Sequence, residues 1–294
     1  MAAEGRSVSL VLGSGGARGY AHIGIIRWLE ENGYRIQSIV GASMGALIGG
    51  IYAVGKLDAY RDWVCTIDRM DVFRLLDFSL GQGGLVKGDK IMNALRQFME
   101  DRRIEDLPIR YTAVAVDIAS EKEVWINRGN IFEAIRASIS LPLFFTPYRR
   151  NGVYLLDGGI LNPVPIAPTF QDDSDRVIAV NLAGAPSREY GDGQDGEEHE
   201  DQGAYAKLRE FLQSLRPGAG IREKLGVYEV IDQALDAMQG SIARHKIAAY
   251  PPDILVELPR NLCGVLEFDR AGEVIDAGYR AAAAQIPAAE RRLR

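Results

Sequence analysis

The chain has 294 residues, of which 47% are apolar and 25% charged, and its formal net charge is −6. This length can bury a large core, as one α/β domain or two smaller ones, and the composition is that of an ordinary globular protein. Seven acidic residues and one base in segment 186–203 account for the whole charge imbalance, so the charge pattern excludes the electrostatic footprint of a nucleic-acid-binding protein.

Cysteine content and apolar runs limit where the protein is expected to act. Cys65 and Cys263 are too few and too far apart for a disulfide framework or a zinc site. The apolar run near the N-terminus is too short for a secretory signal, and no run approaches the ~20 apolar residues of a membrane span. We therefore expect a cytoplasmic protein in a reducing compartment.

The first predicted element is a buried parallel strand over the apolar run 7–12. It leads into the glycine loop Gly-Ser-Gly-Gly-Ala-Arg-Gly at 13–19. A helix is predicted over 20–32, with Gly33 as its C-cap. Strand, glycine loop and helix in this order are typical of a loop that binds an anion or a cofactor.

Three interpretations of the glycine loop can be compared. A Walker loop requires Lys after its last glycine, but Tyr20 follows Gly19. A dinucleotide fingerprint requires glycine at the sixth position from Gly13, where Arg18 stands. What is left is a cradle of backbone N–H groups for a developing oxyanion, or a structural turn between strand and helix.

A second strand, predicted over 36–40, meets Gly-Ala-Ser-Met-Gly at 41–45, and a helical pattern of small residues follows. The turn is too tight for side chains beside the serine, so Gly41 and Gly45 flank Ser43. Such a turn would lift the Ser43 hydroxyl clear of the sheet at a helix N-terminus. The pattern indicates a serine nucleophile, with an N-capping serine in a tight turn as the alternative.

The middle of the chain alternates between helical and strand patterns. Helices are expected over 55–71, 91–100 and 130–138, a glycine-rich connection over 77–90, a strand over 111–118 and its hairpin partner over 123–127. The proline-broken segment 141–148 groups three aromatic residues, Phe144, Phe145 and Tyr148. They belong either to the core or to the wall of a pocket.

A short strand over 153–156 ends at Asp157-Gly158-Gly159. Functional residues of open α/β sheets gather at the carboxyl ends of strands. Ser43 and Asp157 both stand at such ends. Taken alone, Asp157 is more typical of a turn or a helix cap than of a catalytic residue.

The rest of the chain continues the α/β pattern, and its C-terminal third contains no diagnostic motif. We expect a proline-rich helix start at 162–170, a buried strand at 176–182, a mobile acidic loop at 186–203, helices at 204–215 and 222–249, a last strand at 253–258 and a closing helix at 272–285.

A serine nucleophile needs a proton acceptor, and the chain has three histidines, His22, His199 and His245. In the usual α/β-hydrolase chain order the histidine follows the acid, which leaves His199 and His245. Neither lies in a context that resembles a loop at the carboxyl end of a strand, so a Ser-His-Asp triad is unsupported. Asp157 is the remaining candidate. A buried carboxylate in contact with the hydroxyl can serve as the base, which makes a Ser43–Asp157 dyad the hypothesis.

Four sequence blocks in this order resemble those of patatin-like phospholipases: GSGGARG at 13–19, GASMG at 41–45, ASISLP at 137–142 and DGG at 157–159. The resemblance covers residues 7–182 and is to the bacterial single-domain branch. It implies one catalytic domain over 1–294 with a three-layer α/β/α fold and a mainly parallel central sheet.

For the site, the resemblance implies Ser43 as nucleophile, Asp157 as base, and Gly15 and Gly16 as oxyanion donors supported by Arg18, with no catalytic metal and no cofactor. Gly13, Gly41, Gly45, Gly158 and Gly159 are the remaining motif glycines.

The expected activity is hydrolysis of lipid acyl esters by a phospholipase A or lysophospholipase, with transient contact at a membrane surface and no nucleic-acid partner. The alternatives are an acyltransferase or thioesterase that uses the same acyl-serine, a regulatory or binding protein that retains the site, and a nucleotide-binding module. Head-group and acyl-chain preference and the oligomeric state are left open.

Overall fold

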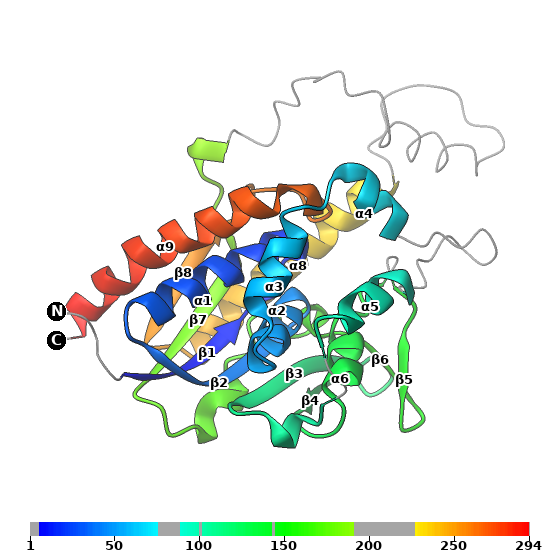
Figure 1. The fold of residues 1–294 in the computed structure, drawn as a ribbon, viewed down its shortest axis with the longest axis horizontal. Coiled ribbons are helices and arrows are strands. Elements are labelled where there is room, and N and C mark those ends of the chain that lie inside the picture. The colour runs from blue at the N-terminus through cyan, green and yellow to red at the C-terminus, as the bar shows by residue number, and fades with distance from the viewer. Residues whose placement is uncertain (1–5, 76–88, 100–101, 143–144, 191–226, 294) are drawn as a thin grey trace.

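A mixed, mainly parallel β-sheet forms the centre of the protein in the computed structural model, which describes residues 6–75, 89–99, 102–142, 145–190 and 227–293 (Figure 1). The strands are β1 (Ser7–Leu12), β2 (Arg35–Ala42), β3 (Arg110–Asp117), β4 (Lys122–Ile126), β5 (Tyr148–Arg150), β6 (Val153–Asp157), β7 (Arg176–Gly184) and β8 (Ile254–Pro259). Their order is β5-β6-β3-β2-β1-β7-β8, and β4 also pairs with β3. The pairs from β3 through β2, β1 and β7 to β8 are all parallel.

The helices named in the structure are α1 (Ala21–Glu31), α2 (Met44–Ala53), α3 (Leu57–Val64), α4 (Arg69–Leu75), α5 (Asp89–Arg96), α6 (Ile131–Ser138), α8 (Val227–Ala249) and α9 (Ala271–Arg292). Short 3₁₀ helices include η1 (Gly16–Tyr20), η3 (Gly158–Ile160) and η4 (Ala167–Gln171).

The alternation of side chains along the strands explains the layers. Leu10 and Leu12 of β1 belong to the main apolar core, which includes residues of α1, α2 and α9. Val11, between them, points to the opposite face, where it clusters with Ala179 of β7 and Ala243 of α8. Helices therefore cover both faces of the sheet, and the predicted three-layer α/β/α fold is confirmed.

Helices α1 and α9 lie side by side on one face (Figure 1), and two glycines set their separation. A Cβ at Gly24 of α1 would lie 1.9 Å from the carbonyl oxygen of Ile275, and one at Gly278 of α9 would lie 2.1 Å from that of Ala21. The two backbones touch directly at this crossing. The last helix of the chain is thereby fixed against the helix that follows the first glycine loop.

The pairing of two strands, β2 and β6, with one edge of β3 positions the site. Residues 113–117 pair with β4 along one edge. On the other edge, β2 pairs in parallel as far as Val114, which lies opposite Ala42. The antiparallel strand β6 takes over at Ala115, which lies opposite Asp157. Strands β2 and β6 thus run towards each other along one edge of β3, and their carboxyl ends meet.

Most predicted elements lie within two residues of their expected bounds, but four do not. The predicted helix 91–100 ends at Arg96, the predicted helix start at 162–170 is the 3₁₀ helix η4 from Ala167, and the predicted closing helix 272–285 continues to Arg292. The fourth is the predicted helix 55–71. The structure divides this stretch into α3 and the start of α4, separated at 65–68. Residues 77–88 of the predicted connection 77–90, the acidic residues 191–203, the predicted helix 204–215 and residues 222–226 of the predicted helix 222–249 lie outside the described residues.

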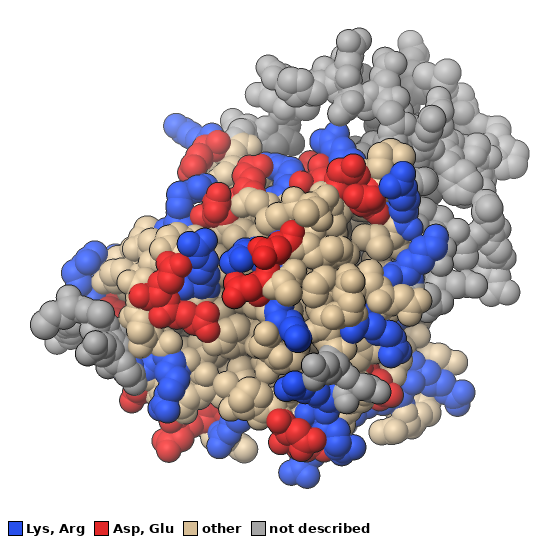
Figure 2. Space-filling model, viewed as in Figure 1, with Lys and Arg blue, Asp and Glu red and all other residues tan. Residues whose placement is uncertain are grey.

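Charges of both signs are mixed on the face seen in Figure 2. Exposed ion pairs among the described residues include Arg27–Glu31, at 2.7 Å, and Arg270–Glu273, at 2.6 Å. Exposed pairs of this kind stabilise a fold by about 1 kcal/mol or less. Among the described helices, none is long and apolar enough to cross a membrane.

Candidate active site

Ser43 stands in a strained turn between β2 and α2. Its backbone angles are φ 55° and ψ −124°, a conformation that costs a non-glycine residue free energy and is common at functional sites. A Cβ at Gly41 would lie 2.3 Å from the carbonyl carbon of Gly45, and one at Gly45 would lie 2.0 Å from the carbonyl oxygen of Leu12. The turn therefore requires glycine on both sides of Ser43.

The side chain of Ser43 does not cap the helix that follows it. Ser43 occupies the N-cap position of α2 but makes no side-chain capping hydrogen bond. The N-capping interpretation of this serine is therefore wrong. Its hydroxyl is available for another interaction, while the N-terminal dipole of α2 favours negative charge beside it.

The segment at the end of α6 holds both Ser43 and Asp157 in place. The Ser43 N–H donates to Ser138 Oγ at 3.0 Å, and the Ser138 hydroxyl donates to the carbonyl oxygen of Val114 at 2.6 Å. Two residues later, the carbonyl oxygen of Ser140 accepts the N–H of Asp157 at 3.0 Å. The sequence block 137–142 thus connects the serine turn with the end of β6.

Asp157 is 1% exposed and uses only one of its carboxylate oxygens in a well-formed hydrogen bond. Oδ1 accepts the N–H of Gly159 at 2.7 Å and so caps η3. Oδ2 is buried and has no partner of good hydrogen-bond geometry in the described part of the chain. The capping interpretation of Asp157 is therefore correct, but the capping hydrogen bond uses only one of the two carboxylate oxygens.

Burial raises the pKa of Asp157 from 3.8 to about 7. The main cause is desolvation of the carboxylate. A side-chain interaction with the Ser43 hydroxyl and the hydrogen bond from Gly159 each lower the pKa in part. The Ser43 hydroxyl is thus close enough to act on Asp157, in a looser geometry than a well-formed hydrogen bond, as is common in unliganded active sites. A carboxylate with a pKa near neutrality can accept a proton at physiological pH.

Gly158 and Gly159 let the turn after Asp157 pass close to its neighbours. A Cβ at Gly158 would lie 2.1 Å from the carbonyl oxygen of Val114, and one at Gly159 would lie 2.7 Å from Ser14 Oγ. The backbone after Asp157 therefore packs against both β3 and the first glycine loop.

The glycine loop presents two free backbone donors. The N–H groups of Gly13, Ser14 and Ala17 donate to carbonyl oxygens of Val180, Pro163 and Val265. Within the described residues, the N–H groups of Gly15 and Gly16 donate to nothing. Both glycines line the same pocket as Ser43 and Asp157, as an oxyanion hole requires.

Arg18 fixes the orientation of this loop from inside the protein. It is 3% exposed, and its Nε donates to the carbonyl oxygen of Gly15 at 3.2 Å. Its other nitrogens donate to the carbonyl oxygen of Arg260, at 3.0 Å, and to Asp236 Oδ1 in α8, at 2.8 Å. Because the two ends of a trans peptide point in opposite directions, holding the Gly15 carbonyl also aims the Gly16 N–H.

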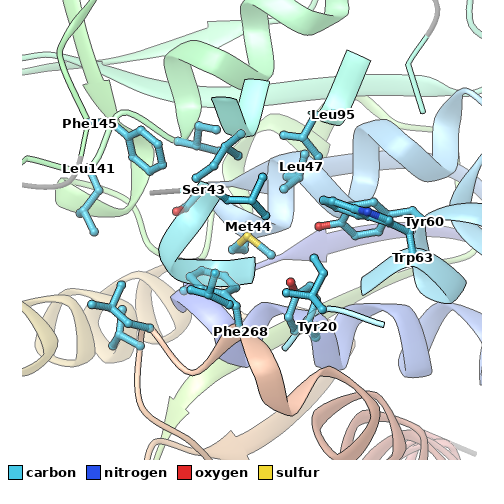
Figure 3. A pocket seen from close by; sticks show the side chains of 18 residues that line it. Tyr20, Ser43, Met44, Leu47, Tyr60, Trp63, Leu95, Leu141, Phe145 and Phe268 are labelled. Atoms are coloured by element: carbon cyan, nitrogen blue, oxygen red, sulfur yellow. The ribbon is translucent and has the colours of Figure 1, made fainter. Parts of the chain in front are cut away.

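Two pockets meet at Ser43. The first is almost entirely apolar and encloses about 920 Å³, its open mouth included. Figure 3 shows the side chains around it. They come from η1, α2, α3, α4, α5, Ile67, Ile139, Leu141, Phe145 and the 265–268 segment. Among the predicted aromatics, Phe145 lines this pocket and Tyr148 is not among its lining residues; Phe144 lies outside the described residues.

The second pocket is smaller and more polar, at about 410 Å³. It shares Gly16, Ser43, Leu141 and Val265 with the apolar pocket, and it adds Ser14, Gly15, Arg18, Asp157, Leu235, Asp236 and Gln239. Ser43 therefore lies at the junction of an apolar and a polar space.

The histidines that the structure describes take no part in these pockets. His22 is fully buried in α1, its Nε2 lies 2.8 Å from the carbonyl oxygen of Gly13, and desolvation lowers its pKa to about 4. His245 lies exposed on α8, with Nδ1 2.7 Å from the carbonyl oxygen of Ser241 in the same helix. His199 falls outside the described residues. Nor does any group of His, Cys, Asp or Glu side chains in the described ranges have an arrangement suited to a metal ion.

Sequence patterns did not single out three parts of this site. Ser138 stands in the sequence only as part of a motif block. Asp236 and Gln239 lie in a helix without any motif, and Trp63 is one of two aromatic residues on α3. The spacing of 236 and 239, one helical turn apart, was the only local signal that these two share a face.

Comparison with known proteins adds family information to this geometry. The model of the family "Patatin-like phospholipase" matches residues 10–170. Uncharacterized NTE family proteins of Mycobacterium bovis and Mycobacterium tuberculosis are 38% identical to this chain, over 95% of this chain and 90% of theirs. The lysophospholipase NTE1 of Saccharomyces cerevisiae is 32% identical over 66% of this chain, and the match spans 12% of that protein. Among solved structures, VipD from Legionella pneumophila aligns over 95% of this chain and 67% of its own, with 15% identity and a TM-score of 0.40, which is too distant to carry an argument.

Proposed function

The chain belongs to the patatin-like phospholipase family, and on that premise we propose that it is a serine hydrolase of lipid acyl esters, with Ser43 as nucleophile and Asp157 as general base. The name of the yeast relative, a lysophospholipase, supports lysophospholipids and related single-chain esters as the substrate class.

One observation carries the proposal most directly. A serine that does not cap its helix stands in a strained turn beside a buried carboxylate. One oxygen of that carboxylate makes no well-formed hydrogen bond to the described residues, and burial raises the pKa of the group to about 7. Burying a carboxylate without full hydrogen bonding costs free energy, so such an arrangement is typical of a functional site rather than a structural one.

In the first half of the proposed reaction, Asp157 accepts the hydroxyl proton of Ser43 while Ser43 Oγ bonds to the acyl carbon. The carbonyl oxygen becomes an oxyanion, and the N–H groups of Gly15 and Gly16 stabilise it. The loss of one such donor typically reduces kcat by about 10²–10³. The bond between the acyl carbon and the alcohol oxygen then breaks, and the alcohol leaves with the proton from Asp157.

In the second half, water attacks the acyl-enzyme and Asp157 accepts its proton. The bond between Ser43 Oγ and the acyl carbon breaks, Ser43 regains its proton from Asp157, and the fatty acid leaves. The same base thus serves both halves of the reaction. The apolar pocket at Ser43 is the proposed site for the acyl chain, because burying each CH₂ group is favourable by about 0.8 kcal/mol.

Two other functions are compatible with the same residues. An acyltransferase or thioesterase would form the same acyl-Ser43, and product analysis with an added acceptor alcohol separates it from a hydrolase. A regulatory protein that retains the site would act through partners, and Ser43→Ala would then complement a deletion as well as the wild type.

The direct test measures hydrolysis of a lysophospholipid and of a p-nitrophenyl acyl ester by the wild type, Ser43→Ala and Asp157→Asn. We expect kcat of each variant to be at least about 10³-fold lower than that of the wild type, because a dyad fails when either member is removed. Circular dichroism should show that both variants remain folded. Normal turnover by either folded variant would rule out the dyad.

A further inference from the structure

The two pockets at Ser43 divide the space that a bound ester can occupy. The acyl carbon must lie against Ser43 Oγ, and its carbonyl oxygen must face the free N–H groups of Gly15 and Gly16. An acyl chain of apolar CH₂ groups belongs in the apolar pocket. The remaining substituent of the ester, the alcohol part, must then extend into the polar pocket.

The polar pocket contains groups that lack hydrogen-bond partners. Ser14 is 8% exposed, and its buried Oγ makes no hydrogen bond to any residue that the structure describes. The side chain of Gln239, half-buried on α8, also makes none within the described part of the chain. A buried hydroxyl without a partner costs free energy. A ligand that brings its own donors and acceptors would relieve that cost.

The charges around the pocket narrow the chemistry of this ligand. Arg18 is already engaged by Asp236 and by the carbonyl oxygens of Gly15 and Arg260. Its positive charge is balanced by the carboxylate of Asp236, so the lining residues that the structure describes offer no free cation to a phosphate. Neutral hydroxyl groups fit it better than an anion does.

We propose that this polar pocket binds the alcohol part of the ester, and that Gln239 and Ser14 make the enzyme favour alcohols with free hydroxyl groups, such as glycerol. The inference rests on the proposed acyl-ester hydrolysis and adds to it a specificity-determining subsite. The phosphate of a lysophospholipid would then lie beyond the pocket, and the glycerol carbons inside it.

Two esters that differ only in hydroxyl groups test this subsite. 1-Octanoylglycerol and n-propyl octanoate share the acyl chain and a three-carbon alcohol, and both can be assayed below the concentrations at which they aggregate. The readout is the ratio of kcat/KM for the glycerol ester to kcat/KM for the propyl ester, measured within each variant. We expect a ratio of about ten or more for the wild type, the effect of one to two neutral hydrogen bonds.

Gln239→Leu is expected to lower this ratio at least about fivefold, and Ser14→Ala to lower it in the same direction. Met238→Leu is the matched control, because Met238 is the neighbouring residue on α8, is 54% exposed and does not line the pocket. Its ratio should equal that of the wild type.

A wild-type ratio near one, or a ratio unchanged in both Gln239→Leu and Ser14→Ala, would overturn the subsite. Failure of the wild type to hydrolyse either ester would instead overturn the proposed function.

Discussion

At the scale of single residues, burying the carboxylate of Asp157 costs folding free energy and makes this group a stronger base. Its backbone and Oδ1 are fixed by Ser140 and Gly159, while Oδ2 stays buried without a well-formed hydrogen bond. An ordinary solvated aspartate would be too weak a base for a serine hydroxyl. Desolvation raises its pKa to about 7 and so makes it a stronger base, at the expense of the stability of the folded state when it is ionised.

The pKa of Asp157 predicts the pH dependence of activity. Only the ionised carboxylate accepts the Ser43 proton, so kcat/KM should rise tenfold per pH unit below pH 7 and level off above it. The measurement is kcat/KM for a p-nitrophenyl ester between pH 5 and 9, with product detected by a pH-independent method. A profile that is flat down to pH 5 would contradict Asp157 as the base.

The same pKa shift predicts that Asp157→Asn stabilises the protein at alkaline pH. Below the unfolded-state pKa near 4, Asp157 is protonated in both states and contributes no ionisation cost. As pH rises from about 4 to about 7, the folded state resists ionisation and loses stability relative to the unfolded state. Asn mimics the neutral carboxyl, so chemical denaturation should show the variant more stable than wild type by a few kcal/mol at pH 8.

The matching control for that measurement is the same comparison at pH 3.5, where the difference between the two proteins should disappear. Equal stabilities at pH 8 would show that Asp157 is not desolvated in the folded protein.

At the scale of elements, the site results from how β2 and β6 share one edge of β3. Ala42 pairs with Val114, and Asp157 pairs with the next residue, Ala115. The two carboxyl ends meet because the strands run in opposite directions, not because they are neighbouring parallel strands. The sequence predicted that Ser43 and Asp157 both end strands, but the antiparallel direction of β6 is set by long-range pairing that no local pattern encodes.

Arg18 connects the glycine loop to α8, and its replacement predicts a kinetic effect. Arg18→Lys keeps the positive charge, but an ammonium group lacks the planar array of donors that reaches Gly15, Arg260 and Asp236 together. The Gly15–Gly16 peptide should then lose its fixed orientation. We expect kcat to fall by about 10–100-fold with a smaller change in KM, measured with the p-nitrophenyl ester.

Arg27→Lys is the control for that substitution. Arg27 lies on the exposed side of α1, where it pairs with Glu31 and lies over the ring of Tyr279, 5.4 Å from the ring centroid, and it does not line either pocket. This variant should keep the wild-type kcat. If Arg18→Lys also kept it, the loop would not depend on this guanidinium for its orientation.

At the scale of the whole molecule, the apolar pocket is assembled from elements spread over most of the chain. Leu47 of α2, Trp63 of α3 and Phe268 near the start of α9 face the same space (Figure 3). The motif residues around Ser43 and Asp157 could be found in the sequence because local turn geometry demands glycine at fixed positions. The pocket could not, because its walls come from tertiary packing and its residues differ little from ordinary core residues.

The pocket predicts a strong dependence on acyl-chain length. For a series of p-nitrophenyl esters, kcat/KM should rise about three- to fourfold per added CH₂, the equivalent of about 0.8 kcal/mol each, until the pocket is filled. Leu47→Trp, which adds bulk to the pocket wall one helical turn from Ser43, should shift the optimum to shorter chains. A flat profile in the wild type would mean that the acyl chain binds elsewhere.

The central claim is that Ser43 is a nucleophile activated by Asp157, and labelling with a fluorophosphonate probe tests it most directly. Wild type, Ser43→Ala and Asp157→Asn are treated with the probe, and their intact masses are measured. We predict a single adduct on the wild type, none on Ser43→Ala, and labelling slowed by at least about a hundredfold in Asp157→Asn. Labelling of Ser43→Ala as fast as the wild type, or no adduct on the folded wild-type protein, would contradict the account.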